Sequence, residues 1–194
     1  MKRTHRPRAP GARIRRTSIR PVAILALTLL LAGCSSMDIN DFRGTQPELD
    51  IHDYFQGELR AWGIVENRSG VATRQFTVDM VGRLEGDTLV LEEDFEYADG
   101  ETDRRVWRIR KEGEHRYVGT AGDVIGEARG EARGRAFHWE YRVDLKVGDS
   151  TYRVAFDDWM YRQEDDVVIN RATITKWGFE VAQVTVVFQK EGGE

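Results

Sequence analysis

The stretch FHWEYRVDLKVGDSTYRVAFDDWMY (137–161) decides the fold more clearly than any other part of the chain. Over 137–147 every odd residue is apolar and every even residue is polar, which is typical of a strand with one buried face. Gly148-Asp149 then supplies a two-residue turn. Because a slip of one residue would invert every side chain, the pattern predicts one antiparallel register. Its pairs are Val147–Ser150, Leu145–Tyr152, Val143–Val154, Tyr141–Phe156, Trp139–Asp158 and Phe137–Met160.

A single acid interrupts the apolar face of this hairpin. Asp158 lies on that face, opposite Trp139, whereas Asp157 points the other way because neighbours on a strand face opposite sides. Asp158 either contacts a ligand or is a buried acceptor for hydrogen bonds, with the Trp139 indole and Arg171 or Lys176 as candidate donors. We favour the structural role, because a lone inward acid more often completes a hydrogen-bond network than performs chemistry.

Two further hairpins have a register that the residues define. The first turns at Gly86-Asp87, and the second turns at Ala98-Asp99-Gly100, where the glycine suits a left-handed position. The first sets Met80 opposite Glu93, and the second sets Glu93 opposite Arg105. We expect this acid and base to point inward, with Arg105 as the donor for Glu93. Such a pair either ties the strands together or contacts a ligand. The remaining pairs are Val78–Phe95, Phe76–Tyr97, Leu89–Ile109 and Leu91–Trp107.

The rest of the domain continues the same alternation, with turn signals every 8 to 14 residues. Glycines within 124–134 suit a bulged or strongly bent strand. The total is about nine or ten strands, which predicts an all-β fold with a single antiparallel up-and-down barrel. A barrel of this size can hold one small ligand. The further strands are expected near 57–65, 115–120, 124–134, 166–176 and 180–189.

The N-terminal segment has the pattern of an export signal. Basic residues dominate the first 20 positions, and an apolar run over 22–32 ends in Leu31-Ala32-Gly33-Cys34. Eleven helical residues span only about 16 Å, which is too short for a bilayer core of roughly 30 Å. We therefore expect a cleaved signal peptide over 1–33, a polar tether over 34–53 and a barrel domain over 54–194.

The ending Leu-Ala-Gly-Cys resembles the lipobox of bacterial lipoproteins. The resemblance implies that Cys34 carries diacylglycerol and becomes the first residue of a membrane-anchored protein. Ser35, rather than an aspartate, follows it, which suggests sorting to the outer membrane with the domain facing the periplasm. The alternative is an ordinary signal peptide with a chance cysteine.

Composition excludes several classes of function. Eight of the 29 basic residues and none of the 33 acidic residues lie before the cleavage site, which leaves 21 bases and a net charge of −12. Such an acidic domain argues against nucleic-acid binding. The histidines lack metal-ligand spacing, and no Gly-x-Ser-x-Gly motif is present. We therefore predict no metal, no cofactor and no catalytic residue.

Several short motifs are distributed across nearly the whole expected mature chain. They are Tyr54-Phe55-Gln56-Gly57, Ala61-Trp62-Gly63, Glu92-Glu93-Asp94-Phe95, Asp99-Gly100, Arg105-Val106-Trp107, Gly122-Asp123-Val124-Ile125-Gly126, Phe156-Asp157-Asp158-Trp159-Met160, Asn170-Arg171-Ala172 and Lys176-Trp177-Gly178. Together they resemble the bacterial lipoprotein family of domain of unknown function 3833 (DUF3833), and the resemblance implies no established activity. Gly57 and Trp62 are also similar to the Gly-x-Trp opening of lipocalins, although their spacing differs from it, and this implies a lipocalin- or calycin-like barrel and little about function.

These observations lead to one function hypothesis and two alternatives. The first is a non-enzymatic, lipid-anchored barrel that binds a fatty acyl or similar hydrophobic ligand. The second is an envelope structural or assembly factor with a fully packed interior. The third is a lipid-modifying enzyme that uses Asp158, Glu93 and Arg105. An open cavity inside the barrel would favour the first hypothesis over the second. The candidate ligand-binding residues are Glu93, Arg105, Trp107, Trp139, Asp158 and Arg171.

Overall fold

A computed structural model describes residues 37–148 and 150–192 of the 194-residue chain. The expected signal peptide (1–33) and the expected lipidation site, Cys34, lie outside the described residues. Over the described part, no helix is long and apolar enough to span a bilayer.

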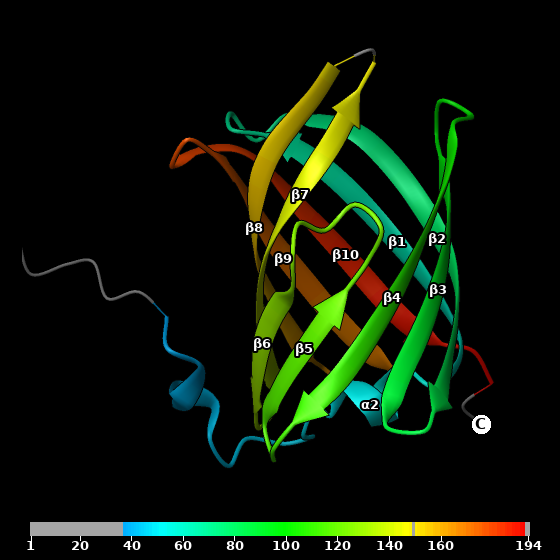
Figure 1. The fold of residues 1–194 in the computed structure, drawn as a ribbon, viewed down its shortest axis with the longest axis vertical. Coiled ribbons are helices and arrows are strands. Elements are labelled where there is room, and N and C mark those ends of the chain that lie inside the picture. Colours follow the sequence, from blue (N-terminus) through cyan, green and yellow to red (C-terminus); the bar gives the residue numbers. More distant parts are fainter. Residues whose placement is uncertain (1–36, 149, 193–194) are drawn as a thin grey trace, which may run out of the picture. The chain divides into compact units, whose positions relative to one another are not determined.

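Ten antiparallel strands form a closed barrel in which each strand pairs with its neighbours in sequence, and β1 pairs with β10 (Figure 1). The all-β up-and-down barrel predicted from the alternating pattern is therefore confirmed. The strands are β1 (Gly57–Asn67), β2 (Ala72–Glu85), β3 (Thr88–Tyr97), β4 (Thr102–Glu112), β5 (Arg116–Thr120), β6 (Ala128–Arg133), β7 (Ala136–Val147), β8 (Ser150–Arg162), β9 (Val167–Lys176) and β10 (Phe179–Lys190).

The three predicted registers are confirmed. Val143 pairs with Val154 on β7 and β8, and Trp139 pairs with Asp158. Met80 pairs with Glu93, which in turn pairs with Arg105 on β4. Because side chains alternate across each strand, these registers place the acids and Arg105 on the inner wall.

The segment expected as one strand over 124–134 differs from the prediction. Strand β6 begins only at Ala128, and it pairs in regular register with both neighbours, so its one glycine, Gly130, does not mark a bulge. Gly130 instead makes room for aromatic rings, since a Cβ there would lie 2.4 Å from the Trp139 ring. The preceding loop over 121–127 turns back along β7, where the Ile125 amide donates to the Arg142 carbonyl at 2.8 Å. This loop places Asp123 beside the barrel wall.

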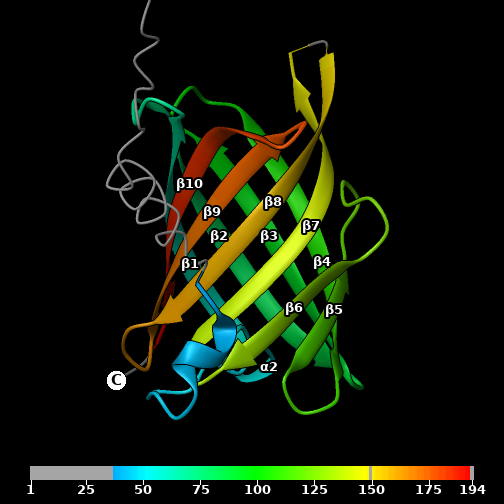
Figure 2. The same cartoon turned by 90° about the vertical axis from the view of Figure 1, so that its left-hand side faces the viewer.

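The expected polar tether is also corrected, because folded structure begins before Tyr54. A short 3-10 helix, η1 (Ile39–Phe42), is followed by a single helical turn, α2 (Ile51–Tyr54), at one end of the barrel (Figures 1 and 2). The Asp50 carboxylate caps α2 by accepting from the His52 amide at 2.8 Å. Leu49 and Phe55 are buried in the core. The segment before Tyr54 is therefore not a linker. Its apolar side chains, although separated by polar residues in the sequence, pack into the core and close one end of the barrel.

Candidate ligand-binding cavity

The barrel encloses a cavity of about 610 Å³. Ile51 and Phe55 line its closed end at α2, and Gly148 and Asp99 line it at the turns of the opposite end. The cavity therefore runs along the barrel interior from α2 to a mouth formed by strand turns. Its volume lies within the range of roughly 300–1,000 Å³ that is typical of small-molecule sites.

Aromatic side chains form a continuous apolar wall in this cavity. The rings of Tyr141 and Phe156 stack with centroids 5.0 Å apart, and Trp107 contacts Tyr141 edge-on at 5.4 Å. Trp139 packs against Trp107 at 5.6 Å. Trp107 and Trp139, two predicted ligand-binding residues, thus lie in the wall. The other apolar lining residues include Phe76, Val78, Met80, Leu91, Phe95, Ile109, Phe137, Leu145, Met160, Ala172, Ile174, Val184, Val186 and Phe188.

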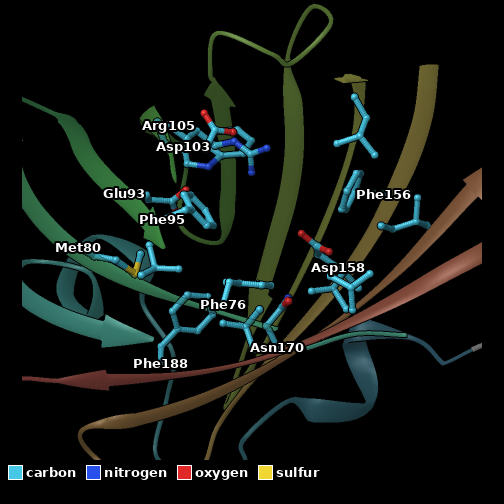
Figure 3. A pocket seen from close by; sticks show the side chains of 18 of the residues that line it. Phe76, Met80, Glu93, Phe95, Asp103, Arg105, Phe156, Asp158, Asn170 and Phe188 are labelled. Carbon is cyan, nitrogen blue, oxygen red and sulfur yellow. The ribbon is translucent and has the colours of Figure 1, made fainter. Parts of the chain in front are cut away.

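Asp158 points from β8 into this apolar space, as Figure 3 shows, and only 5% of it is exposed. The Tyr141 hydroxyl donates a 2.7 Å hydrogen bond to its Oδ2 atom. The expected donors, the Trp139 indole and Arg171, do not fill this role. Oδ1 has no hydrogen-bond partner among the described residues. Burial raises the pKa of Asp158 to about 7, although the Tyr141 hydrogen bond and the Arg105 charge oppose this rise.

Glu93 and Arg105 also point into the cavity, as predicted (Figure 3). The guanidinium of Arg105, however, donates to the Asp123 carboxylate rather than to Glu93. Burial raises the pKa of Glu93 to about 7, and the nearby charge of Arg105 only partly offsets this effect. The Asp158 carboxyl also acts on Glu93 electrostatically, so the four charged groups form one cluster.

Arg171 is the predicted site residue that does not reach the cavity. It lies on the outer face of β9 and donates to the Gln183 side chain at 3.2 Å. Its neighbour Asn170 points inward instead (Figure 3), is 4% exposed, and has no hydrogen-bond partner for Nδ2 among the described residues. The face was ambiguous because β9 carries apolar residues on both sides. Asp158 pairs with Ala172 across β8 and β9, so Ala172 faces the barrel interior. Asn170, two residues away, takes the same inner face, and Arg171 takes the outer face.

Sequence reasoning missed three polar members of the site: Asp123, Tyr141 and Asn170. The predicted register already placed Tyr141 on the same face as Asp158, so its hydroxyl was a detectable donor. Asp123 belongs to a loop, where the alternation of strand residues carries no information about direction. Its contact with Arg105 depends on how the loop folds back onto β7.

One basic residue at the mouth, Arg74, is paired with two acids. Arg74 forms ion pairs with Asp99 and Glu101, and its guanidinium lies 3.4 Å from the centroid of the Tyr97 ring. At the same end of the barrel, Trp177 in the β9–β10 turn is 87% exposed. The mouth therefore combines an ion-pair cluster around Arg74 with exposed aromatic surface.

A second cluster of polar side chains lies on the outer face of β7 and β8. One ligand atom each from His138, Glu140 and Asp157 could be offered to a metal ion, and these atoms lie within 4.8 Å of one another. His138 already contacts the Asp157 carboxylate at 3.0 Å and stacks on the Trp159 ring at 4.3 Å. These contacts explain its position without a metal.

Comparison with protein families identifies the chain. The family described as "Protein of unknown function (DUF3833)" matches residues 28–190. The chain belongs to the DUF3833 family. The resemblance proposed from the sequence motifs is thus confirmed for the family. No curated protein matches this DUF3833 member.

Solved structures support the fold of this DUF3833 protein. An S-type phycobiliprotein lyase, CpeS, from Guillardia theta matches with a TM-score of 0.56 and 10% identity, covering 81% of this chain and 95% of that chain. A protein of unknown function from the DUF3598 family of Nostoc punctiforme matches with a TM-score of 0.51 and 13% identity. That match covers 75% of this chain and 50% of the other, so the DUF3833 chain corresponds to half of it. At these identities the similarity establishes the lipocalin-like fold alone.

Proposed function

We propose that this DUF3833 protein is a lipid-anchored module of the bacterial outer membrane, facing the periplasm, that binds one hydrophobic ligand without catalysis. The observation that carries the proposal is the cavity of about 610 Å³ with a largely apolar wall and a mouth at one end. Binding sites for small apolar molecules combine such a wall with a few convergent polar groups. Here those groups are Asp158, Asn170 and the cluster around Arg105.

The same cavity argues against the alternative of a structural barrel with a packed interior. A core at native density leaves few voids larger than a water molecule. A space that reaches from Phe55 to the mouth at Gly148 is far larger than such a packing defect. The similarity to the lyase supports the fold only, so the proposal depends on the cavity and not on what the lyase does.

Filling the cavity is expected to abolish binding. Val184 lines it from β10 and is only partly buried, so Val184→Trp should place an indole in the open space. The measurement is mass spectrometry of organic extracts from the purified full chain carrying Cys34→Ala, with and without Val184→Trp. We expect the hydrophobic molecule that co-purifies with the parent chain to be lost.

The matched control is Val187→Trp, because Val187 is a neighbouring valine of β10 that does not line this cavity. It should leave the extracted molecule at the parent level. If the parent chain carries no extractable molecule and takes up no hydrophobic fluorophore, the barrel is not a binding module.

Lipid anchoring is expected to require Cys34. Several acyl chains, at about 0.8 kcal/mol per buried CH₂, would make the attachment effectively permanent. We expect the parent protein to stay in the membrane fraction after a high-salt wash and Cys34→Ala to move into the soluble fraction. Replacing the next residue, Ser35→Ala, should leave the protein in the membrane fraction. A Cys34→Ala variant that remains membrane-bound would contradict the anchor.

A further inference from the structure

Three buried polar atoms of the site have no partner among the described residues. Oδ1 of Asp123 belongs to the loop carboxylate that pairs with Arg105. The other two line the cavity, and they are Oδ1 of Asp158, a hydrogen-bond acceptor, and Nδ2 of Asn170, a hydrogen-bond donor. Both side chains are at least 95% buried and both line the cavity. Buried polar groups in proteins are nearly always paired, since an unmade hydrogen bond costs free energy. A group that enters the cavity can satisfy both atoms.

The two atoms belong to one region of the wall. Asp158 pairs with Ala172 and Met160 pairs with Asn170 across β8 and β9, so Asp158 and Asn170 are diagonal neighbours on the inner face. Diagonal neighbours have Cα atoms roughly 7–8 Å apart, within reach of one small polar group between their side chains. A hydroxyl or an amide both donates and accepts, and so matches this acceptor and donor together.

The region lies deep in the barrel. Asp158 is closer in sequence to the α2 end of β8 than to its mouth end, and Asn170 is near the α2 end of β9. Figure 3 shows both side chains directed into the cavity below Phe156. A ligand that contacts them with its polar end must therefore enter polar end first, with its apolar part along the aromatic wall toward the mouth.

The charges around this region select against an anionic ligand. Arg105 is the only basic residue among the described lining residues away from the mouth, and Asp123 already neutralises it. Glu93 and Asp158 lie close enough to Arg105 to interact with its charge, and the Tyr141 hydroxyl is already committed to Asp158. A carboxylate or phosphate placed here would meet carboxyl groups and no free cation.

We propose that the cavity takes an uncharged amphiphile whose hydroxyl or amide end is buried between Asp158 and Asn170. The ligand donates to Oδ1 of Asp158 and accepts from Nδ2 of Asn170. The inference rests on the proposed function and narrows it, because it excludes a free fatty acid among the candidate fatty acyl ligands.

Three probes that share an unbranched ten-carbon chain and differ in their polar end distinguish these ligand classes. 1-Decanol both donates and accepts, methyl decanoate only accepts, and decanoate is an anion. Each is titrated at about pH 8 against the fluorophore N-phenyl-1-naphthylamine bound to the full chain carrying Cys34→Ala. A hydrogen bond to a charged group contributes enough for a change of about tenfold or more. We therefore expect 1-decanol to displace the fluorophore at about tenfold lower concentration than either of the other probes.

Substitutions test whether Asp158 and Asn170 cause the tighter binding of 1-decanol. Asp158→Asn keeps the shape and removes a negative charge, so the advantage of 1-decanol over decanoate should shrink severalfold. Asn170→Leu should weaken 1-decanol and methyl decanoate alike by removing their donor. Asp157→Asn is the matched control, because Asp157 is on the outer face beside His138 and should change nothing.

The outcomes distinguish this inference from the proposed function. Decanoate or methyl decanoate binding as tightly as 1-decanol would overturn the inference and leave the hydrophobic-binding function standing. An equal effect of Asp157→Asn and Asp158→Asn would also overturn it. If the fluorophore does not bind at all, the proposed function fails as well.

Discussion

Gly82→Ala is expected to destabilise the barrel by about 3 kcal/mol or more, because the site has no room for a Cβ atom. Gly82 lies on the inner face of β2, where an added Cβ would be 1.6 Å from the Phe55 carbonyl oxygen and 2.8 Å from its carbon. These are backbone atoms, so no side-chain rotation relieves the overlap. Either β2 or the segment after α2 must move.

Movement of that segment would remove the contacts that close the barrel. The Phe55 ring packs on Phe188 with centroids 5.4 Å apart, and the Tyr54 hydroxyl donates to the Asp166 carbonyl at 2.9 Å. Both side chains are at most 2% exposed. The variant should therefore lose free energy of unfolding and also open the closed end of the cavity.

Urea unfolding monitored by circular dichroism measures this effect, and limited proteolysis between Asp38 and Gln56 reports release of α2. Gly122→Ala is the control, since nothing lies within 4 Å of a Cβ at that position. We expect the control to change the free energy of unfolding by less than about 1 kcal/mol. If Gly82→Ala unfolds at the same urea concentration as the parent, α2 does not seat on β2 as described.

Wild-type stability is expected to fall as pH rises toward 8, and Asp158→Asn should remove much of this loss. Burial raises the pKa of Asp158 from 3.8 to about 7, so the folded state favours the neutral acid. A raised pKa contributes stability that is fully present below the unfolded value and is lost as pH rises through about 7. Glu93, whose pKa burial raises from 4.5 to about 7, acts in the same direction.

The expected size of the effect follows from the shift. Each pKa unit corresponds to about 1.4 kcal/mol, so ionising Asp158 in the folded state costs on the order of 4 kcal/mol between about pH 4 and about pH 8. An asparagine cannot ionise and can still accept from the Tyr141 hydroxyl. The variant should thus resemble the parent near pH 4 and become the more stable of the two near pH 8.

Urea unfolding of both proteins across this pH range measures the difference. Glu93→Gln should show the same trend, whereas Asp94→Asn should give a curve parallel to the parent, because Asp94 points outward and is 59% exposed. Parallel curves for Asp158→Asn and the parent would mean that Asp158 is not held in a buried, apolar setting.

The alternation of residues predicted the all-β barrel, most of its strands and three registers without any tertiary information, although it did not separate the loop over 121–127 from β6. Each register was determined locally, by a short turn at Gly86, Gly100 or Gly148 and by a buried face that tolerates no slip of one residue. The inward positions of Glu93, Arg105 and Asp158 followed directly. The family resemblance came from short motifs distributed over strands, turns and loops of the same domain.

Tertiary structure alone decided which groups meet across the barrel. Asn170 points inward and Arg171 outward because β9 must pair with β8 in one register, and a strand that is apolar on both faces does not reveal this by itself. Asp123 reaches Arg105 through a loop, whose direction no residue period encodes. Closure of one end by α2, and hence a cavity open at the other, arises from contacts between segments far apart in the chain. Local patterns specify which face each side chain takes, whereas barrel closure specifies its neighbours on that face.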